Sequence, residues 1–102
     1  MPTIEEALMY LGYDQSDEMV LTNVQRAMAT AQAILYGAVG EDVEQYLPND
    51  PRIKELILIY TDDLYSERGI HAKLSTATRR LVANMVLQLQ LELARKKTGD
   101  GS

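Results

Sequence analysis

The stretch from Asp50 to Arg68 constrains the fold more than any other part of the chain. Asp50 can accept hydrogen bonds from the first free amides of a helix, and Pro51 suits the first helical position. Apolar residues then recur at three- and four-residue steps, as on the buried side of a helix. They are Ile53, Leu56, Ile57, Tyr60 and Leu64. Three more lie outside this stripe, namely Leu58, Ile59 and Tyr65. A helix that is apolar on more than one side is buried between partners, so we predict a central helix over 51–68.

Two further helices are predicted before the central one. Thr3 and Glu6 have the spacing of a capping box, which predicts a first helix over 4–11. Asp17 favours the start of a second helix, which we expect over 17–37 with Gly37 at its end. Its buried stripe comprises Val20, Val24, Ala27, Met28, Ala31, Ile34 and Leu35. On the opposite side, Ala29 and Ala33 are small enough to let another helix come close.

The last helix is expected over 76–97, with basic residues at its negative end. Within it, residues 86–93 alternate apolar and polar, a pattern typical of a strand. Leu, Gln and Glu favour helix, and no second strand is evident, so we favour a helix here. Its broad apolar side then comprises Leu81, Val82, Met85, Val86, Leu89 and Leu93. Leu87 and Leu91 form a separate narrow stripe, for which another copy of the chain is the simplest partner.

The predicted fold is all-α, a compact bundle of four main helices in one domain over residues 1–97. Residues 41–46 can add one short helical turn, and residues 98–102 are expected to form a disordered tail. The chain has no cysteine, which excludes disulfides and thiolate metal sites. It shows no signal-peptide pattern and no apolar run of the ~20 residues that a membrane helix needs. We therefore expect a soluble protein with no membrane partner.

The net charge of −5 is unevenly divided along the chain. Residues 1–50 hold nine acidic side chains against one basic, a balance of −8, and residues 51–102 hold nine basic against six acidic, a balance of +3. These charges are either ordinary solvated surface or the acidic and basic faces through which neighbouring copies meet. The overall acidity argues against tight, non-specific binding of nucleic acid.

We predict no catalytic residue, no cofactor and no metal site. His71 is the one histidine, and Asp63, Glu67 and His71 are spaced by four, as carboxylate and imidazole ligands of a metal could be. Gly69 is expected to break the helix between them, so we interpret the three as solvated surface. The residues also offer no nucleophile paired with a base. We expect the protein not to be an enzyme.

A basic patch surrounds the loop before the last helix and comprises Arg68, His71, Lys73, Arg79 and Arg80. One interpretation is a nucleic-acid-binding domain that contacts phosphate through Arg79 and Arg80. A protein-facing patch is favoured, since no aromatic residue lies among these side chains to stack on a base. The expected subunit interface comprises Tyr65, Arg68, Arg79, Arg80, Leu87 and Leu91.

The order of these segments resembles the small all-helical head-tail connector proteins of long-tailed bacteriophages. The resemblance rests on Thr-Ile-Glu-Glu-Ala with Leu-Gly-Tyr-Asp near the start, the alanine-rich second helix, Asp-Pro-Arg-Ile-Lys and Asp-Leu-Tyr-Ser-Glu-Arg. In the last of these, Leu64, Tyr65 and Arg68 match a Leu-Tyr-x-x-Arg-like signature of the family. Residues 85–93 are similar to the closing helices of some members. The resemblance covers roughly residues 3–93.

The resemblance implies a structural virion protein rather than an enzyme. Family members form a homo-oligomeric ring of about a dozen copies, bind the phage portal protein and a tail-side completion protein, and let DNA pass without sequence-specific binding. The implied location is the head-tail junction of the virion, reached from the host cytoplasm during assembly. The short last loop and the brief tail depart from the family pattern. The alternative is a small helical protein-interaction or regulatory module without ring assembly.

Overall fold

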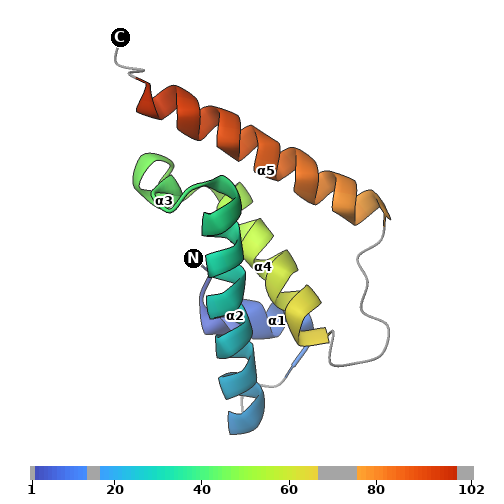
Figure 1. Cartoon of the computed structure of the whole chain (residues 1–102). Helices are drawn as coiled ribbons and strands as arrows, with labels where there is room; N and C mark the ends of the chain where they lie inside the picture. Colours follow the sequence, from blue (N-terminus) through green and yellow to red (C-terminus); the bar gives the residue numbers. More distant parts are fainter. Residues whose placement is uncertain (1, 14–16, 67–75, 99–102) are drawn as a thin grey trace.

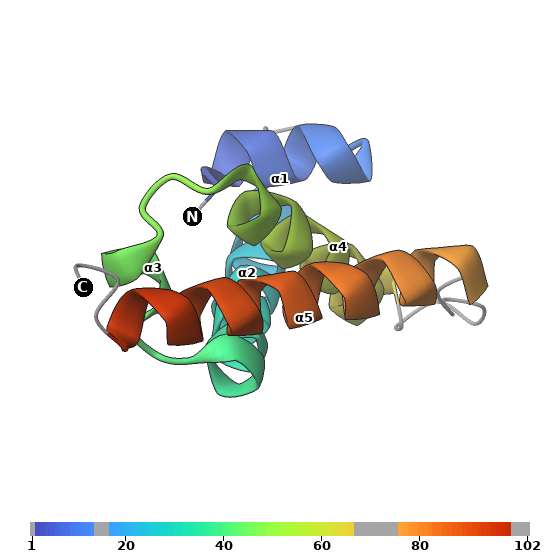
Figure 2. The same ribbon diagram turned by 90° about the horizontal axis from the view of Figure 1, so that it is seen from above.

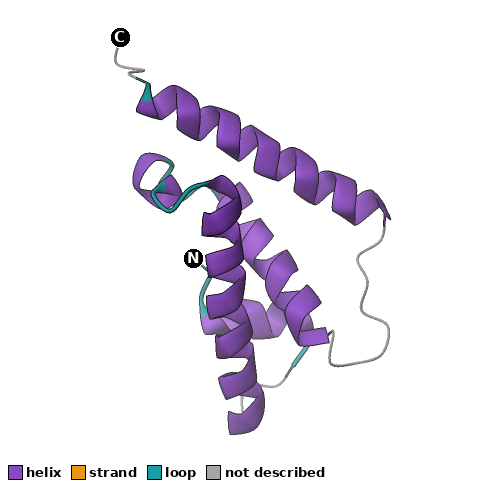
Figure 3. Cartoon of the chain, viewed as in Figure 1, coloured by secondary structure: helices purple, strands orange, loops and turns teal. Residues whose placement is uncertain are grey.

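The computed structural model describes residues 2–13, 17–66 and 76–98. The helices are α1 (Ile4–Leu11), α2 (Glu18–Val39), α3 (Val43–Tyr46), α4 (Pro51–Ser66) and α5 (Thr76–Lys97). Helices are the only regular secondary structure in these ranges, as Figure 3 shows. The all-α prediction is therefore confirmed, and residues 86–93 are helical rather than extended. The predicted tail residues 99–102 lie outside the described ranges, while the Thr98 amide donates to the Ala94 carbonyl at 3.0 Å.

The helix α4 lies at the centre, and α1, α2 and α5 all pack against it (Figures 1 and 2). One of its sides contributes Leu58 to a cluster with α1 and α2, made by Ala7, Leu8, Val24 and Met28. Another side contributes Ile53, Leu56 and Ile57 to a cluster with α2, α3 and α5, which includes Leu35, Val43, Leu89 and Leu93. The prediction of a central helix buried on more than one side is confirmed.

The predicted helix starts are also present. The Glu6 amide donates to Thr3 Oγ1 at 3.1 Å and the Thr3 amide donates to Glu6 Oε1 at 2.9 Å, which completes the capping box. Asp17 accepts from the amides of the first turn of α2. Asp50 Oδ1 accepts from the Arg52 amide at 2.9 Å at the start of α4. Local capping chemistry therefore sets where these three helices begin.

The end of α2 differs from the prediction. Gly37 continues the helix, which ends at Val39 instead. Gly40 follows with φ +147°, a conformation that other residues rarely adopt, and its amide donates to the Tyr36 carbonyl at 2.9 Å. A Cβ at Gly40 would also lie 2.7 Å from Leu93 Cδ2. The glycine that ends α2 is thus the one that lets α5 approach the backbone.

Two residues assigned to the buried stripes are exposed instead. Ile34 is 41% exposed and Leu81 is 52% exposed. Leu81 belongs to the N-terminal part of α5, which extends beyond the end of α4 in both views (Figures 1 and 2). Ala29 and Ala33 are exposed too, and no helix in the described part of the chain covers them. Periodicity located the buried side of each helix but not how far its partners extend.

Replacing Gly40 with Ala tests this packing. The new methyl group has to enter space held by Leu93 while the backbone stays in a strained conformation, so we expect a loss of about 1–3 kcal/mol in unfolding free energy. Gly37→Ala is the matched control, because Gly37 is helical with open space around it. We expect that change to be neutral or to stabilise by up to ~1 kcal/mol. Urea unfolding measures both, and equal effects would contradict the close approach.

Candidate interaction surface

Five exposed side chains follow one side of α5 at three- and four-residue steps: Arg80, Asn84, Leu87, Leu91 and Arg95. We call this set the outer face of α5. Leu87 is 52% exposed and Leu91 is 57% exposed, whereas Leu89 and Leu93 on the other side of the helix are buried. The separate leucine stripe predicted from the sequence is therefore present. Together the two leucines place a narrow apolar strip in water on a helix side that also exposes Arg80 and Arg95.

The guanidinium of Arg52 holds α5 against the start of α4. It donates to both carboxylate oxygens of Glu92, at 2.7 Å from Nη1 and 2.9 Å from Nη2. It also donates to both oxygens of Asp50, at 3.0 Å from Nε and 2.6 Å from Nη2. These hydrogen bonds lower the pKa of both carboxyl groups from their ordinary values and raise the pKa of Arg52. Paired bonds of this kind fix orientation as well as distance.

Further contacts fix the same half of α5. Gln90 Nε2 donates to the Ala38 carbonyl at 2.7 Å, and Lys97 Nζ lies 3.0 Å from Asp42 Oδ2. Leu89 and Leu93, in the same half of α5, lie in the apolar cluster formed with α2, α3 and α4. The part of α5 from Gln88 onward is therefore held by charge, hydrogen bonds and packing together. Val82, Met85 and Val86 also pack against this cluster, so Leu87 and Leu91 of the outer face stand on a packed helix rather than on a loop.

The structure describes five of the six predicted interface residues, and they come from two helices, α4 and α5. Arg79 and Arg80 are exposed near the start of α5, on the same helix as the two leucines. Tyr65 lies at the end of α4, where its ring meets that of Tyr13 edge-on with centroids 5.2 Å apart. It thus belongs with the segment that follows α1. The predicted Arg68 lies outside the described residues, as do Glu67, His71 and Lys73 of the other proposed groups.

An exposed surface on α1 was not predicted from the sequence. Met9 is 80% exposed, and Tyr10 and Tyr13 are 44% and 45% exposed. Burial is the main cause that raises the pKa of Tyr10, and the nearby carboxylates of Glu55 and Asp62 raise it further. We call Glu5, Met9, Tyr10, Tyr13 and Glu55 the acidic face. The available signal was that Met9 and Tyr10 lie outside the apolar stripe of the first helix, which comprises Ile4, Ala7, Leu8 and Leu11.

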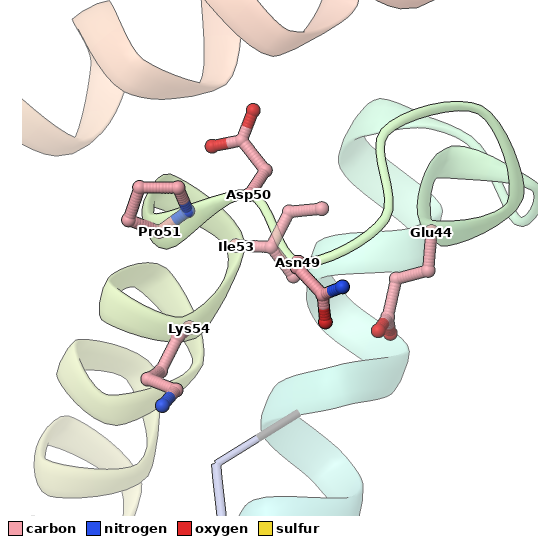
Figure 4. Close-up of a pocket in the computed structure, with 6 residues that line it drawn as sticks. All are labelled: Glu44, Asn49, Asp50, Pro51, Ile53 and Lys54. Carbon is pink, nitrogen blue, oxygen red and sulfur yellow. The ribbon is translucent and has the colours of Figure 1, made fainter.

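A pocket of about 270 Å³ lies where α4 begins, lined by Glu44, Asn49, Asp50, Pro51, Ile53 and Lys54 (Figure 4). Its charged groups do not converge, because in Figure 4 the Asp50 carboxylate points toward α5 and the Lys54 ammonium points away from it. Each also has a partner within the chain. Asp50 binds Arg52, Lys54 Nζ lies 2.8 Å from Glu6 Oε2, and Glu44 accepts from the Tyr36 hydroxyl. The pocket is therefore part of the scaffold.

A second pocket of about 270 Å³ lies between α2 and the end of α4, lined by Asn23, Arg26, Ala27, Thr30, Leu64 and Tyr65. Among the described residues, no group of three or more His, Cys, Asp or Glu side chains is placed to hold a metal ion. Within the same ranges, no helix combines the length and hydropathy needed to span a bilayer. The chain matches no protein-family model, no curated protein and no solved structure.

Replacing Arg52 with Met tests how α5 is held. The pKa values of Asp50 and Glu92 are lowered from 3.8 and 4.5, so their pairs with Arg52 stabilise the fold above those values and lose this effect as the pH falls. We therefore expect the variant to unfold at lower urea than the wild type at pH 7, with the gap narrowing toward pH 3. Arg79→Met, at an exposed arginine of α5, is the control. A gap that does not depend on pH would contradict this role.

Proposed function

We propose that this protein is a structural virion protein, a head-tail connector whose copies form a ring beneath the portal and join the DNA-filled head to the tail. The observation that carries the proposal is the outer face of α5, which exposes Leu87 and Leu91 on a helix held in place by Arg52. A ring subunit needs such a surface on a fixed element. The order of helices expected from the resemblance to phage connectors is consistent with this proposal.

The distribution of charge supports assembly into a closed ring. A ring forms when two different surfaces of each copy meet head to tail. The acidic first half and the basic second half of the chain provide surfaces of opposite charge for such a contact. The net charge of −5 also suits a lumen through which DNA passes without being held. In this proposal the partners are other copies, the portal protein, the tail-side completion protein and the passing DNA.

The alternative is a small helical interaction module whose outer face of α5 binds a different protein and forms no ring. The same two exposed leucines support both candidate functions. The two functions differ in what binds this surface, which is another copy of the chain in one case and a different protein in the other. Sedimentation velocity at several concentrations, with and without the portal protein of the same phage, decides between them. A chain that remains monomeric under all these conditions favours the alternative.

Replacing both Leu87 and Leu91 with Lys tests the proposed contact surface. Both positions are exposed, so we expect the monomer to stay helical. Assembly should be lost, because two charges would be buried against an apolar neighbour. The matched control is Met19→Lys with Ile34→Lys, which makes the same chemical change at exposed apolar positions of α2. Circular dichroism and sedimentation provide the readouts. Normal assembly of the Leu87/Leu91 variant would show that copies meet through another surface.

Reversing Arg79 and Arg80 to Glu should weaken assembly less than the leucine changes. Charges at the edge of a contact are screened by salt, so the defect should be largest at low ionic strength. Sedimentation at low and high salt measures this dependence. A defect of the same size at every salt concentration would contradict an electrostatic role for the two arginines.

A further inference from the structure

Two exposed surfaces of the chain each combine apolar side chains with charged ones. One of these surfaces is acidic and the other is basic. The acidic face exposes Met9, Tyr10 and Tyr13, with Met9 at 80%. The outer face of α5 exposes Leu87 and Leu91. Met, Tyr and Arg are among the residue types enriched in protein interfaces. Both surfaces therefore have the composition of contact regions, and their chemistry indicates which partner each one fits.

The charges on the two surfaces are complementary. The helix α1 carries Glu5 and Glu6 and no basic residue, but Glu6 is paired with the exposed Lys54 of α4. Among the described residues, the unpaired acidic charge of this surface therefore comes from Glu5 and from Glu55 of α4, which lies close enough to raise the pKa of Tyr10. The helix α5 carries five basic residues and one acidic residue, Glu92. The outer face presents Arg80 and Arg95, and the one carboxylate of α5, Glu92, is bound by Arg52 and also lies close enough to Arg95 for that arginine to help lower its pKa. An acidic apolar surface thus has its complement on the same chain.

The two surfaces lie on opposite sides of the molecule. Figure 2 shows α1 and α5 separated by α2 and α4. One copy therefore cannot satisfy both surfaces by itself, whereas neighbouring copies can do so in series. A symmetric contact between two outer faces would bring arginines together, and one between two acidic faces would bring carboxylates together. Like charges at a contact are repelled, so the charges favour contact between unlike faces.

We propose that the outer face of α5 in one copy binds the acidic face of the next copy. This contact rests on the proposed function and specifies which surfaces the ring would join. Leu87 and Leu91 pack beside Met9 and Tyr10 of the neighbour, while Arg80 and Arg95 lie near Glu5 and Glu55. Each copy uses both faces once. The contact is therefore heterologous, and its repetition generates a ring when the rotation between copies closes.

Engineered cysteines test this contact directly, because the chain has none of its own. Copies with Met9→Cys are mixed with copies with Leu91→Cys and treated with a short bis-maleimide cross-linker. We expect covalent heterodimers in the mixture and no homodimer from either variant alone. Gln25→Cys, exposed on α2 and outside both faces, replaces Met9→Cys in the control mixture, which should not cross-link. Mass spectrometry of the linked peptides identifies the pair.

Charge reversal provides the second readout. Glu5→Lys with Glu55→Lys on one face, or Arg80→Glu with Arg95→Glu on the other, should each weaken association about tenfold, as expected for the loss of close charge pairs. Mixing the two variants should restore association between the reversed faces. Circular dichroism of each variant confirms that it is folded. Failure of the mixture to recover would count against the pairing of these two faces.

The outcomes distinguish this inference from the proposed function. Cross-linking of Leu91→Cys copies to one another would overturn the heterologous contact and leave a symmetric one. If the Leu87/Leu91 lysine variant blocks assembly but no Met9–Leu91 link forms, the connector proposal stands and this pairing is wrong. If the wild type remains monomeric with the portal protein present, and no link forms, both are overturned.

Discussion

The burial of α4 on two sides is the constraint on which the rest of the structure depends. Leu58 faces the cluster made with α1 and α2, while Leu56 and Ile57 face the cluster made with α2, α3 and α5. The two cores therefore share two helices, α2 and α4, and both α1 and α5 pack against this pair. Because the acidic face lies on the α1 side and the leucine strip lies on α5, α4 also sets the relation between the two surfaces.

The first turn of α4 has two roles that reinforce each other. Asp50 accepts from the Arg52 amide and so supports the helix start, and the same carboxylate orients the guanidinium that reaches Glu92. Apolar burial of Leu89 and Leu93 supplies the driving force that holds α5, since this is the dominant favourable term in folding. The partly exposed ion pairs add direction, which apolar contact lacks.

Local signals in the sequence predicted the helices well because caps and periodicity act over a few residues. The Thr3 cap and the separate position of Leu87 are examples. Features set by distant parts of the chain could not be predicted. Which of the two glycines, Gly37 or Gly40, ends α2 depends on where Leu93 of α5 approaches the backbone. Leu93 is more than fifty positions away from Gly40 in the sequence. For the same reason the acidic face was missed, since it needs α1 and α4 to be placed side by side.

The outer face of α5 is presented in its described position only while the helix is packed against the rest of the chain. The local stability of α5 therefore bears on whether this face can bind a partner. Detaching this helix would expose Leu89 and Leu93 and break the pairs between Arg52 and Glu92. In the proposed assembly, a neighbour bound across Leu87 and Leu91 would select the attached state, so its apparent affinity would scale with the fraction of copies in which the helix is in place. By the same thermodynamic linkage, each neighbour bound in that way would make detachment rarer, and backbone amides from Gln88 onward would exchange with solvent more slowly in such an assembly than in the free chain.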